Sequence, residues 1–486
     1  MKKAIIGILC FLIAGVGGFF SLKFFREGGF SLKPGEIVFS ENFPEDEKDE
    51  YLSLFSEKEL KKDLSLSYEF SDSILNSSNA GERFILIDAL VPVDDFYSTK
   101  ESISQAEFDT MINEKNINVV SVSKLTPDRK LLQVDGKYFL DLFSSGAKFQ
   151  YLKVSGSDED IAVAEQVLAE KQKKVPEKKN TLSFVQTGVT AFGRGMNAMM
   201  NEVGDGLYFS EKIGTFLSSF DLTHTSNEAS FSDSASESNI CADNRFAETL
   251  KAIGLDIVEL TGNHNLDCGA VDAINTVDKY TEMGVQIVGG GKNAEEAGKE
   301  LEISQKGNII TMLAYNQSTG GATTDANPGA NQYSEEDARA KISEAKGRGD
   351  VVIVDMQYYE CAEYDTEVES DACTRADSSA GDQIGVFRSL IDMGADIVVG
   401  TSAHQTQTYE KYKNGFIYYG LGNIFFDQYW WPGTTKSLGL VHYFWGNSLV
   451  QTRRFGTIYD ENLQTRLMGE DEFVPFIEKL NEYTPE

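Results

Sequence analysis

The sequence predicts an α/β protein of two or three domains with an apolar N-terminal segment, on three observations. The chain has 486 residues, which is too long for one compact core. Its second half repeats a helix, a glycine, a short β-branched run and a polar turn, as parallel or mixed sheets do. Its first residues include an uncharged stretch long enough to cross a bilayer.

The N-terminal segment, residues 1–26, is expected to be a membrane anchor. Two lysines precede residues 4–22, which carry no charge, and Lys23 and Arg26 follow. A cleaved signal peptide is the alternative, because "AGVGG" supplies small residues. Apolar residues resume after that run, which favours an uncleaved anchor. We therefore expect a single-pass protein of the cell membrane with the bulk of the chain outside the cytoplasm.

The middle of the chain carries no motif of its own. Residues 27–157 begin with a polar, acidic stretch and continue with strand-like runs between polar helical stretches, which predicts a small α/β domain. Residues 158–180 read as a charged helix ending near Pro176, and we expect a helical linker there. The remaining residues, 181–486, form the predicted second domain.

The charge balance excludes one class of partner. The chain contains 76 Asp and Glu against 44 Lys and Arg, a formal net charge of −32. Binding to nucleic acid requires concentrated lysine and arginine, so no nucleic-acid partner is expected.

The cysteines fit an exported protein. Cys10 falls in the apolar segment and four others remain, Cys241, Cys268, Cys361 and Cys373. These allow three pairings, of which we expect Cys241–Cys268 and Cys361–Cys373. Four free buried thiols are the alternative, and the absence of a CxxC spacing disfavours a zinc site.

Two segments of the second domain echo each other. Residues 254–264 and 394–404 both read Gly-x-Asp-Ile-Val, then five residues, then histidine. His264 and His404 would follow the carboxyl ends of two strands, where ligands gather in α/β sheets. A histidine that is hydrogen-bonded for structural reasons is the alternative at each position. The matched pair, with Asn263 beside it, favours a polar site.

Three segments in order resemble the CapA family of bacterial capsule and poly-γ-glutamate synthesis proteins. They are "ELTGNHNLDCG", "VVGTSAHQTQTYE" and "IYYGLGNIFFDQ", within residues 182–430. The resemblance implies a calcineurin-like αββα sandwich for the C-terminal domain and a location at the membrane surface. It also implies an anionic cell-surface polymer or its synthesis machinery as a partner, beside the membrane, which the N-terminal segment predicts independently.

The resemblance also implies a site, which this sequence alters. Val189 stands where the family has an aspartate ligand, and Gln357 and Ser402 stand where it has histidines. The ligands that remain are two imidazoles, one amide and one carboxylate, which suit a single Zn²⁺ or Mn²⁺ ion. A two-metal site is not expected. The implied metal ligands are His264, His404, Asn263 and Glu228. The implied catalytic residues are Asn263, His264 and Arg194, and the residues expected to line the site as substitutes are Asn227, Gln357, Glu360 and Ser402.

Three functions follow as hypotheses. The first is a CapA-like protein that synthesises or anchors an anionic polymer, as a single-metal hydrolase in which Arg194 contacts the anionic group. The second is a polymer-binding protein on the same fold without catalysis, and the third is a metal-free hydrolase using Glu228 or Glu360 as base. The aromatic run "FFDQYWWPG", residues 425–433, either stacks on sugar rings or packs in the core. Asp267 is expected to cap the following helix, with orientation of His264 as the alternative.

Overall fold

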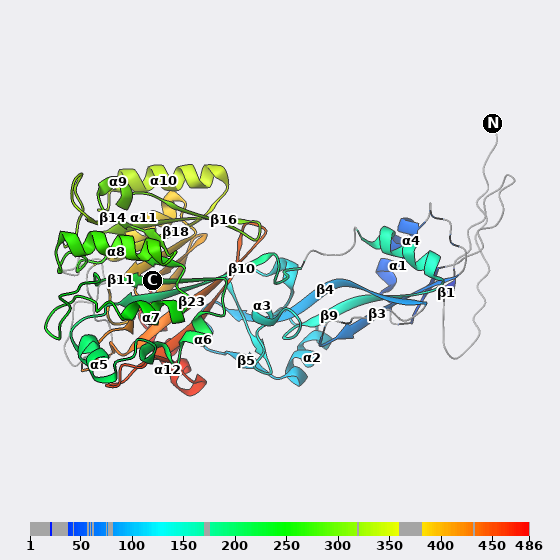
Figure 1. Cartoon of the computed structure of the whole chain (residues 1–486). Helices are drawn as coiled ribbons and strands as arrows, with labels where there is room; N and C mark the ends of the chain where they lie inside the picture. The colour runs from blue at the N-terminus through cyan, green and yellow to red at the C-terminus, as the bar shows by residue number, and fades with distance from the viewer. Residues whose placement is uncertain are drawn as a thin grey trace. The chain divides into compact units, whose positions relative to one another are not determined.

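The structure is a computed structural model of the chain (Figure 1). It describes every residue except 1–19, 22–36, 42, 56–57, 59, 61–62, 74, 76–80, 170–174, 318–319, 359–381, 431–432 and 486. The expected membrane anchor therefore lies outside the described residues, apart from Phe20–Ser21. Within the described part of the chain, no helix is long and apolar enough to cross a membrane. The chain forms two compact units, which are taken in turn.

The first unit comprises residues 1–93, 102–125 and 132–176 and is built on a mixed sheet with strand order β1-β2-β3-β9-β4-β6. Its elements are β1 (Phe20–Ser21), β2 (Ile37–Phe39), α1 (Glu45–Phe55), β3 (Leu64–Ser71), β4 (Glu82–Asp95), β5 (Ser102–Ile103), α2 (Gln105–Asn113), β6 (Val119–Ser121), η1 (Val122–Lys124), β8 (Gln133–Val134), α3 (Phe139–Leu142), β9 (Lys148–Ser155) and α4 (Asp158–Leu168).

Helix α4 belongs to the first unit, which differs from the helical linker expected over residues 158–180. Ser157 caps the helix by accepting from the backbone N–H of Asp160. Ile161, Ala164 and Leu168 lie at helical spacing and are buried in the core that β3, β4 and β9 share. The charged face suggested a solvated linker, but the apolar face anchors the helix to the sheet.

The second unit takes residues 94–101 and 126–131 from the first half of the chain, together with residues 177–486. Its elements are β7 (Arg129–Leu131), β10 (Thr181–Thr190), α5 (Gly195–Val203), η2 (Tyr208–Ser210), α6 (Gly214–Leu217), β11 (Leu222–Asn227), α7 (Phe246–Ala252), β12 (Ile257–Glu259), α8 (Ala270–Glu282), β13 (Gln286–Val288), β14 (Gly290–Gly291), α9 (Ala294–Ala297), β15 (Leu301–Gln305), β16 (Asn308–Asn316), β17 (Gly329–Ala330), α10 (Glu335–Arg348), β18 (Val351–Gln357), α11 (Gln383–Met393), β19 (Ile397–Thr401), β20 (Tyr409–Tyr412), β21 (Gly415–Tyr418), β22 (Asn423–Phe425), β23 (Lys436–Trp445), β24 (Leu449–Ile458), β25 (Arg466–Leu467) and α12 (Glu470–Asn481).

Two sheets face each other in this unit. The β10 sheet has strand order β13-β12-β11-β10-β23-β24-β25, with β22 beside β10, and the β18 sheet has order β15-β16-β18-β19-β21-β20. One core joins their inner faces, for example Phe184 and Leu440 of the first sheet with Ile353 and Val399 of the second. Apolar side chains on alternate residues of these strands account for this pairing of faces.

Helices cover the outer faces. Helices α10 and α11 lie on the β18 sheet (Figure 1). Ile342 of α10 and Leu390 of α11 belong to one buried cluster with Val354. Beside the β10 sheet, the ring of Phe246 in α7 stacks on Phe192, which follows β10, with centroids 4.2 Å apart. The unit is therefore layered as helix, sheet, sheet, helix, which confirms the expected α/β class.

The predicted helix–glycine–strand repeats are present and are divided between the two sheets. Gly254, Gly284 and Gly394 follow helices α7, α8 and α11, and each has a positive φ. The strands that come next are β12 and β13 in the β10 sheet and β19 in the β18 sheet. The two echoing segments thus belong to facing sheets.

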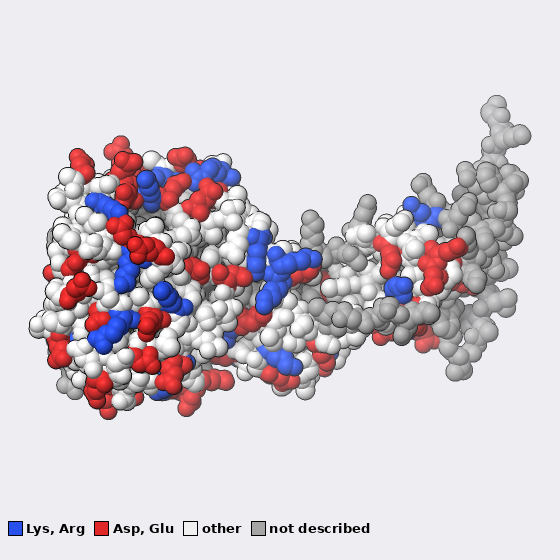
Figure 2. All heavy atoms as spheres, viewed as in Figure 1, with Lys and Arg blue, Asp and Glu red and all other residues white. Residues whose placement is uncertain are grey.

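The surface of the second unit mixes charges of both signs. On the face drawn in Figure 2, Asp and Glu side chains lie among Lys and Arg side chains. The pairs Arg339–Glu335 and Lys341–Asp337 on α10 are examples. On this face the acidic residues are therefore distributed and not gathered in one patch.

Candidate functional site

The inner faces of the two sheets change from apolar to polar toward the carboxyl ends of their parallel strands. The inward residues of β18 run from Ile353 through Asp355 to Gln357. On β11 the corresponding residues include His224, and Glu228 follows the strand's last residue. All these side chains are buried. The candidate site lies at this polar end.

Gln357 connects residues of both sheets. Its Nε2 donates to Asn263 Oδ1 at 3.1 Å and to Glu228 Oε1 at 3.4 Å. The hydroxyl of Thr401 lies 3.3 Å from Gln357 Oε1. Three residues predicted for the site are therefore brought together, although they lie far apart in the sequence.

The turn that carries Asn263 is held from behind. Asn316 Nδ2 donates to the carbonyl oxygen of Thr261 at 2.6 Å, and Asn265 Nδ2 donates to that of Leu260 at 2.8 Å. Gly262 is required for close approach, since a Cβ there would lie 2.7 Å from the Cα of Glu228. The Asn-His motif thus sits on a fixed backbone.

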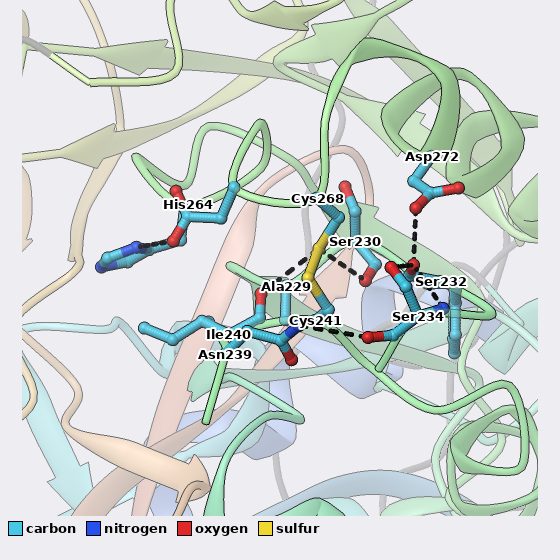
Figure 3. The surroundings of a disulfide bond; sticks show 12 residues. Ala229, Ser230, Ser232, Ser234, Asn239, Ile240, Cys241, His264, Cys268 and Asp272 are labelled. Carbon is cyan, nitrogen blue, oxygen red and sulfur yellow. Dashed lines mark hydrogen bonds and ion pairs between the residues drawn. A yellow bond between two sulfur atoms is a disulfide. The ribbon is translucent and has the colours of Figure 1, made fainter. Parts of the chain in front are cut away.

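A disulfide fastens the same turn to the loop after β11 (Figure 3). Cys241 and Cys268 are bonded, which confirms that predicted pairing. Close by, Ser230 Oγ donates to the carbonyl oxygen of Asn265 at 2.7 Å. The second expected pair, Cys361 and Cys373, lies outside the described residues.

His264 is oriented by an acidic neighbour. Its Nδ1 lies 2.7 Å from Asp267 Oδ2, and both side chains are partly exposed. The N-cap of α8 is Gly269 and not Asp267, so the expected capping role of Asp267 is wrong. Asp267 instead fixes the ring of His264.

His404 is oriented from β22. Its Nδ1 lies 2.8 Å from Asn423 Oδ1, and Asn423 Nδ2 donates to the carbonyl oxygen of Thr434 at 3.2 Å. In the sheet register, Asn423 pairs with Val189, which is buried. Val189, which stands where the family has an aspartate, is thus an apolar neighbour of Asn423. Ser402, two residues before His404, is buried and has a φ of 82°.

Arg194 is held in a specific pose. Its φ is 47°, its Nη2 donates to Asp427 Oδ1 at 2.6 Å, and the other oxygen of Asp427 accepts from Gly195 N at 2.7 Å. The guanidinium lies 4.6 Å from the ring centroid of Phe426. The same ring lies 5.0 Å from the imidazole of His404, so both nitrogen-bearing groups contact Phe426.

Deeper between the sheets lies a cluster of buried ionisable groups. His224 Nε2 is 3.1 Å from Asp355 Oδ2, and Gln186 Nε2 donates to Asp355 Oδ1 at 2.6 Å. Burial, with the nearby charge of Asp355, raises the pKa of Glu259 to about 7. Burial, with a smaller effect of His224, lowers the pKa of His442 to about 3.

Sequence reasoning missed several residues that shape the site. They are Thr401, Asn423, Phe426, Asp427, Asp355 and Glu259. A signal existed for two of them, because Asp355 and Glu259 are acidic residues inside otherwise apolar β-branched runs.

Of the two remaining predicted residues, the structure describes one. Asn227 is buried on β11, and its Nδ2 donates to the carbonyl oxygen of Ala229 at 2.9 Å. Glu360 lies outside the described residues.

The described residues do not assemble a carboxylate-containing metal shell. The acceptor oxygens of Glu228 and Asn263 converge on the amide nitrogen of Gln357, so a donor stands where a cation would be bound. Within the described ranges, no group of three or more His, Cys, Asp or Glu side chains is arranged to hold a metal. Asn263 and Glu228 are thus engaged by Gln357 in this arrangement, and the ligand set of His264, His404, Asn263 and Glu228 stays a prediction.

Comparison with known families decides the relationship. Residues 183–428, slightly over half of the chain, match the family described as bacterial capsule synthesis protein PGA_cap. The chain belongs to this family. This membership confirms the resemblance on which the site residues were assigned and links the PGA_cap protein to capsule and poly-γ-glutamate synthesis.

Individual relatives carry matching names. The chain is 30% identical over 205 residues to the capsule biosynthesis protein CapA of Bacillus anthracis, covering 40% of this chain and 46% of that one. It is 29% identical over 199 residues to the PGA biosynthesis protein CapA of Bacillus subtilis strain 168, covering 40% and 48%. It is 26% identical over 218 residues to a probable polyglutamine synthesis accessory protein of Mycobacterium tuberculosis, covering 39% and 54%. The chain thus spans about half the length of each relative.

Solved structures give weaker likenesses. A phosphatase of Mycoplasma pneumoniae aligns with a TM-score of 0.34 at 12% identity, covering 58% of this chain and 95% of its own. A protein of Thermus thermophilus aligns with a TM-score of 0.29 at 8% identity, covering 55% and 100%.

Proposed function

We propose that this PGA_cap protein binds an anionic polymer of the capsule or poly-γ-glutamate type at the polar end of its two sheets. The observation that carries the proposal is that the guanidinium of Arg194 and the imidazole of His404 both lie against the ring of Phe426. A guanidinium with an ordered fork is suited to carboxylates, and the imidazole adds a second donor through Nε2 when the ring is protonated.

The arrangement supports binding better than hydrolysis. Val189 and Gln357 replace groups that a metal-dependent hydrolase needs, and Gln357 bridges Glu228 and Asn263 through its amide. The site nevertheless remains polar, since Thr401 donates to Gln357 and Asn316 donates to the backbone of the Asn263 turn. A site that had simply decayed would be free to fill with apolar side chains.

The Cys241–Cys268 disulfide supports placement outside the cytoplasm, where disulfides form and persist. Together with the charge-free N-terminal segment, it favours a protein attached to the membrane and facing the envelope. The overall negative charge does not prevent binding of a polyanion. At physiological ionic strength the Debye length is about 8 Å, so groups within the site dominate.

The test is calorimetric titration of the full chain with a poly-γ-glutamate octamer. Arg194→Gln and His404→Gln should each weaken binding about tenfold, whereas Arg194→Lys should lose less because it keeps the charge. Arg339→Gln is the matched control, since that arginine is exposed on α10 and pairs with Glu335 one helical turn away. Equal affinity in all variants would refute the proposal.

A single-metal hydrolase is the second candidate, favoured by the orientation of the two histidines. Both have Nδ1 against a side-chain oxygen, as metal-ligating histidines do. Plasma mass spectrometry of the purified chain after incubation with Zn²⁺ or Mn²⁺ decides between the candidates. One equivalent of bound metal in the unaltered chain, lost in His264→Ala and His404→Ala, would favour the hydrolase. If the unaltered chain retains no metal, the hydrolase is refuted and polymer binding is the function that stands.

A further inference from the structure

Two aromatic side chains stand exposed beside the candidate site. Tyr429 is 46% exposed and Trp430 is 59% exposed, and their rings are 5.3 Å apart at an angle of 79°. The guanidinium of Arg194 lies 5.9 Å from the centroid of the Trp430 ring. Single exposed apolar residues are common, but two adjoining aromatic rings next to a guanidinium form a defined surface.

This surface rests on rigid structure. Residues 423–428 are all buried, including Phe426 and Asp427, which hold Arg194. Gln428 is fixed because Thr434 Oγ1 donates to its carbonyl oxygen at 2.5 Å. The rings of Tyr429 and Trp430 therefore project from an anchored stem.

The chemistry of the surface indicates its ligand. We infer that Tyr429, Trp430 and Arg194 form a subsite for a pyranose ring of an envelope glycan, next to the polymer site proposed above, with which it shares Arg194. The apolar C–H face of a pyranose stacks on an exposed indole, and its hydroxyl groups accept from a guanidinium.

The fixed orientation of Arg194 favours this class of ligand. Asp427 accepts from Nη2 of Arg194 and fixes the plane of the guanidinium, so the other N–H groups are directional donors that suit hydroxyl groups. A ringless polyanion such as poly-γ-glutamate gains nothing from an aromatic platform. The subsite therefore implies that the protein holds a saccharide and an anionic chain side by side.

The subsite is tested by calorimetry on the full chain with two sugars, N,N′,N″,N‴-tetraacetylchitotetraose and tetragalacturonate. Binding of either one, weakened at least tenfold by Trp430→Ala and restored to within threefold by Trp430→Phe, is the expected result. A preference for galacturonate assigns an acidic sugar and a preference for the chitotetraose a neutral one. Phe70→Ala, which removes a 50% exposed aromatic ring in the first unit, is the matched control.

A second titration distinguishes failure of the sugar subsite from failure of the proposed polymer binding. The poly-γ-glutamate octamer is titrated into the same Trp430→Ala protein and should bind as it does to the unaltered chain. If neither sugar binds, or if Trp430→Ala leaves sugar binding unchanged, the subsite is refuted whatever the octamer does. An unchanged melting temperature for Trp430→Ala verifies that the variant is folded.

Discussion

Glu259 is a carboxyl group enclosed between two sheets. Its Oε1 accepts from the backbone N–H of Thr261 at 2.5 Å and from the hydroxyl of the same residue. Burial and the nearby Asp355 raise its pKa to about 7 from an ordinary value of 4.5. The unfolded chain therefore loses this proton at a lower pH than the folded chain does.

Replacing Glu259 by glutamine should remove a pH-dependent loss of stability. The stability linked to Glu259 is fully present below pH 4.5 and is lost as the pH rises through 7, since the folded state binds the proton more tightly. Glu259→Gln should thus gain stability relative to the unaltered chain between these values, on the order of 3 kcal/mol above pH 7. Urea unfolding across pH 4 to 9 measures this difference.

The stability linked to His442 has the opposite pH dependence. For this reason the effect of Glu259 is measured as the difference in unfolding free energy between Glu259→Gln and the unaltered chain. The pKa of His442 is lowered to about 3, so its contribution is present above 6.5 and is lost as the pH falls toward 3. In the unaltered chain the two slopes oppose each other between about 4.5 and 6.5. A difference curve for Glu259→Gln that stays flat would contradict the assigned pKa.

At the scale of elements, the turn between β12 and α8 depends on the loop after β11. The disulfide joins residues separated by 27 positions, and hydrogen bonds from that loop reach the same turn. Asn263 and His264 therefore owe their placement to a neighbouring loop as well as to their own strand.

Removing the disulfide should loosen this turn. Cys241→Ser combined with Cys268→Ser should lower the free energy of unfolding by about 3 kcal/mol, because the unfolded chain regains the entropy of an open loop. Binding of the poly-γ-glutamate octamer should weaken less than in Arg194→Gln, since Arg194 is held by Asp427 instead. Dithiothreitol should destabilise the unaltered chain more than the double variant, which keeps only the expected Cys361–Cys373 pair; equal sensitivity of both would contradict the role of this bond.

The elements themselves were largely predictable from sequence. Glycines after helices and β-branched runs before polar turns correctly identified β12, β13 and β19, because these signals are local. Their division between two sheets was not predictable, since two adjacent units can continue one sheet or start a facing one with the same pattern.

The site was predictable in part for the same reason. Glu228, Asn263 and Gln357 were recognised by motif, and the structure brings them together. Asp427 and Asn423 orient Arg194 and His404 across 233 and 19 positions respectively. The sequence contains no local signal for such partners, because the contact exists only after the sheets have assembled.

At the scale of the whole molecule, the second unit is completed by residues from the first half of the chain. Phe96 lies 5.8 Å from Tyr409 and 5.4 Å from Phe416 between ring centroids, and the guanidinium of Arg454 lies 5.0 Å from its ring. Its carbonyl oxygen accepts from Arg454 Nη2 at 2.6 Å. The second unit is therefore not the continuous domain of residues 181–486 that the sequence suggested.

Phe96→Ala should destabilise the second unit by about 3–5 kcal/mol, because it empties a buried aromatic position. Tryptophan fluorescence during urea unfolding reports this unit alone, since all three tryptophans, 430, 431 and 445, belong to it. Phe70→Ala, at an exposed position, should leave the same transition within about 0.5 kcal/mol. A transition unaffected by Phe96→Ala would show that residues 94–101 are dispensable.

The assignment of residues 94–101 to the second unit also sets an order of events during biosynthesis. Tyr97 Oη accepts from the backbone N–H of Lys411, 314 positions later. At about 5–20 residues per second, a ribosome makes these two residues roughly 15 to 60 s apart. During that interval Tyr409, Lys411 and Phe416, which pack against or bond to Phe96 and Tyr97, have not yet been synthesised. The aromatic side chains of Phe96 and Tyr97 therefore lack these partners until β20 and β21 are made.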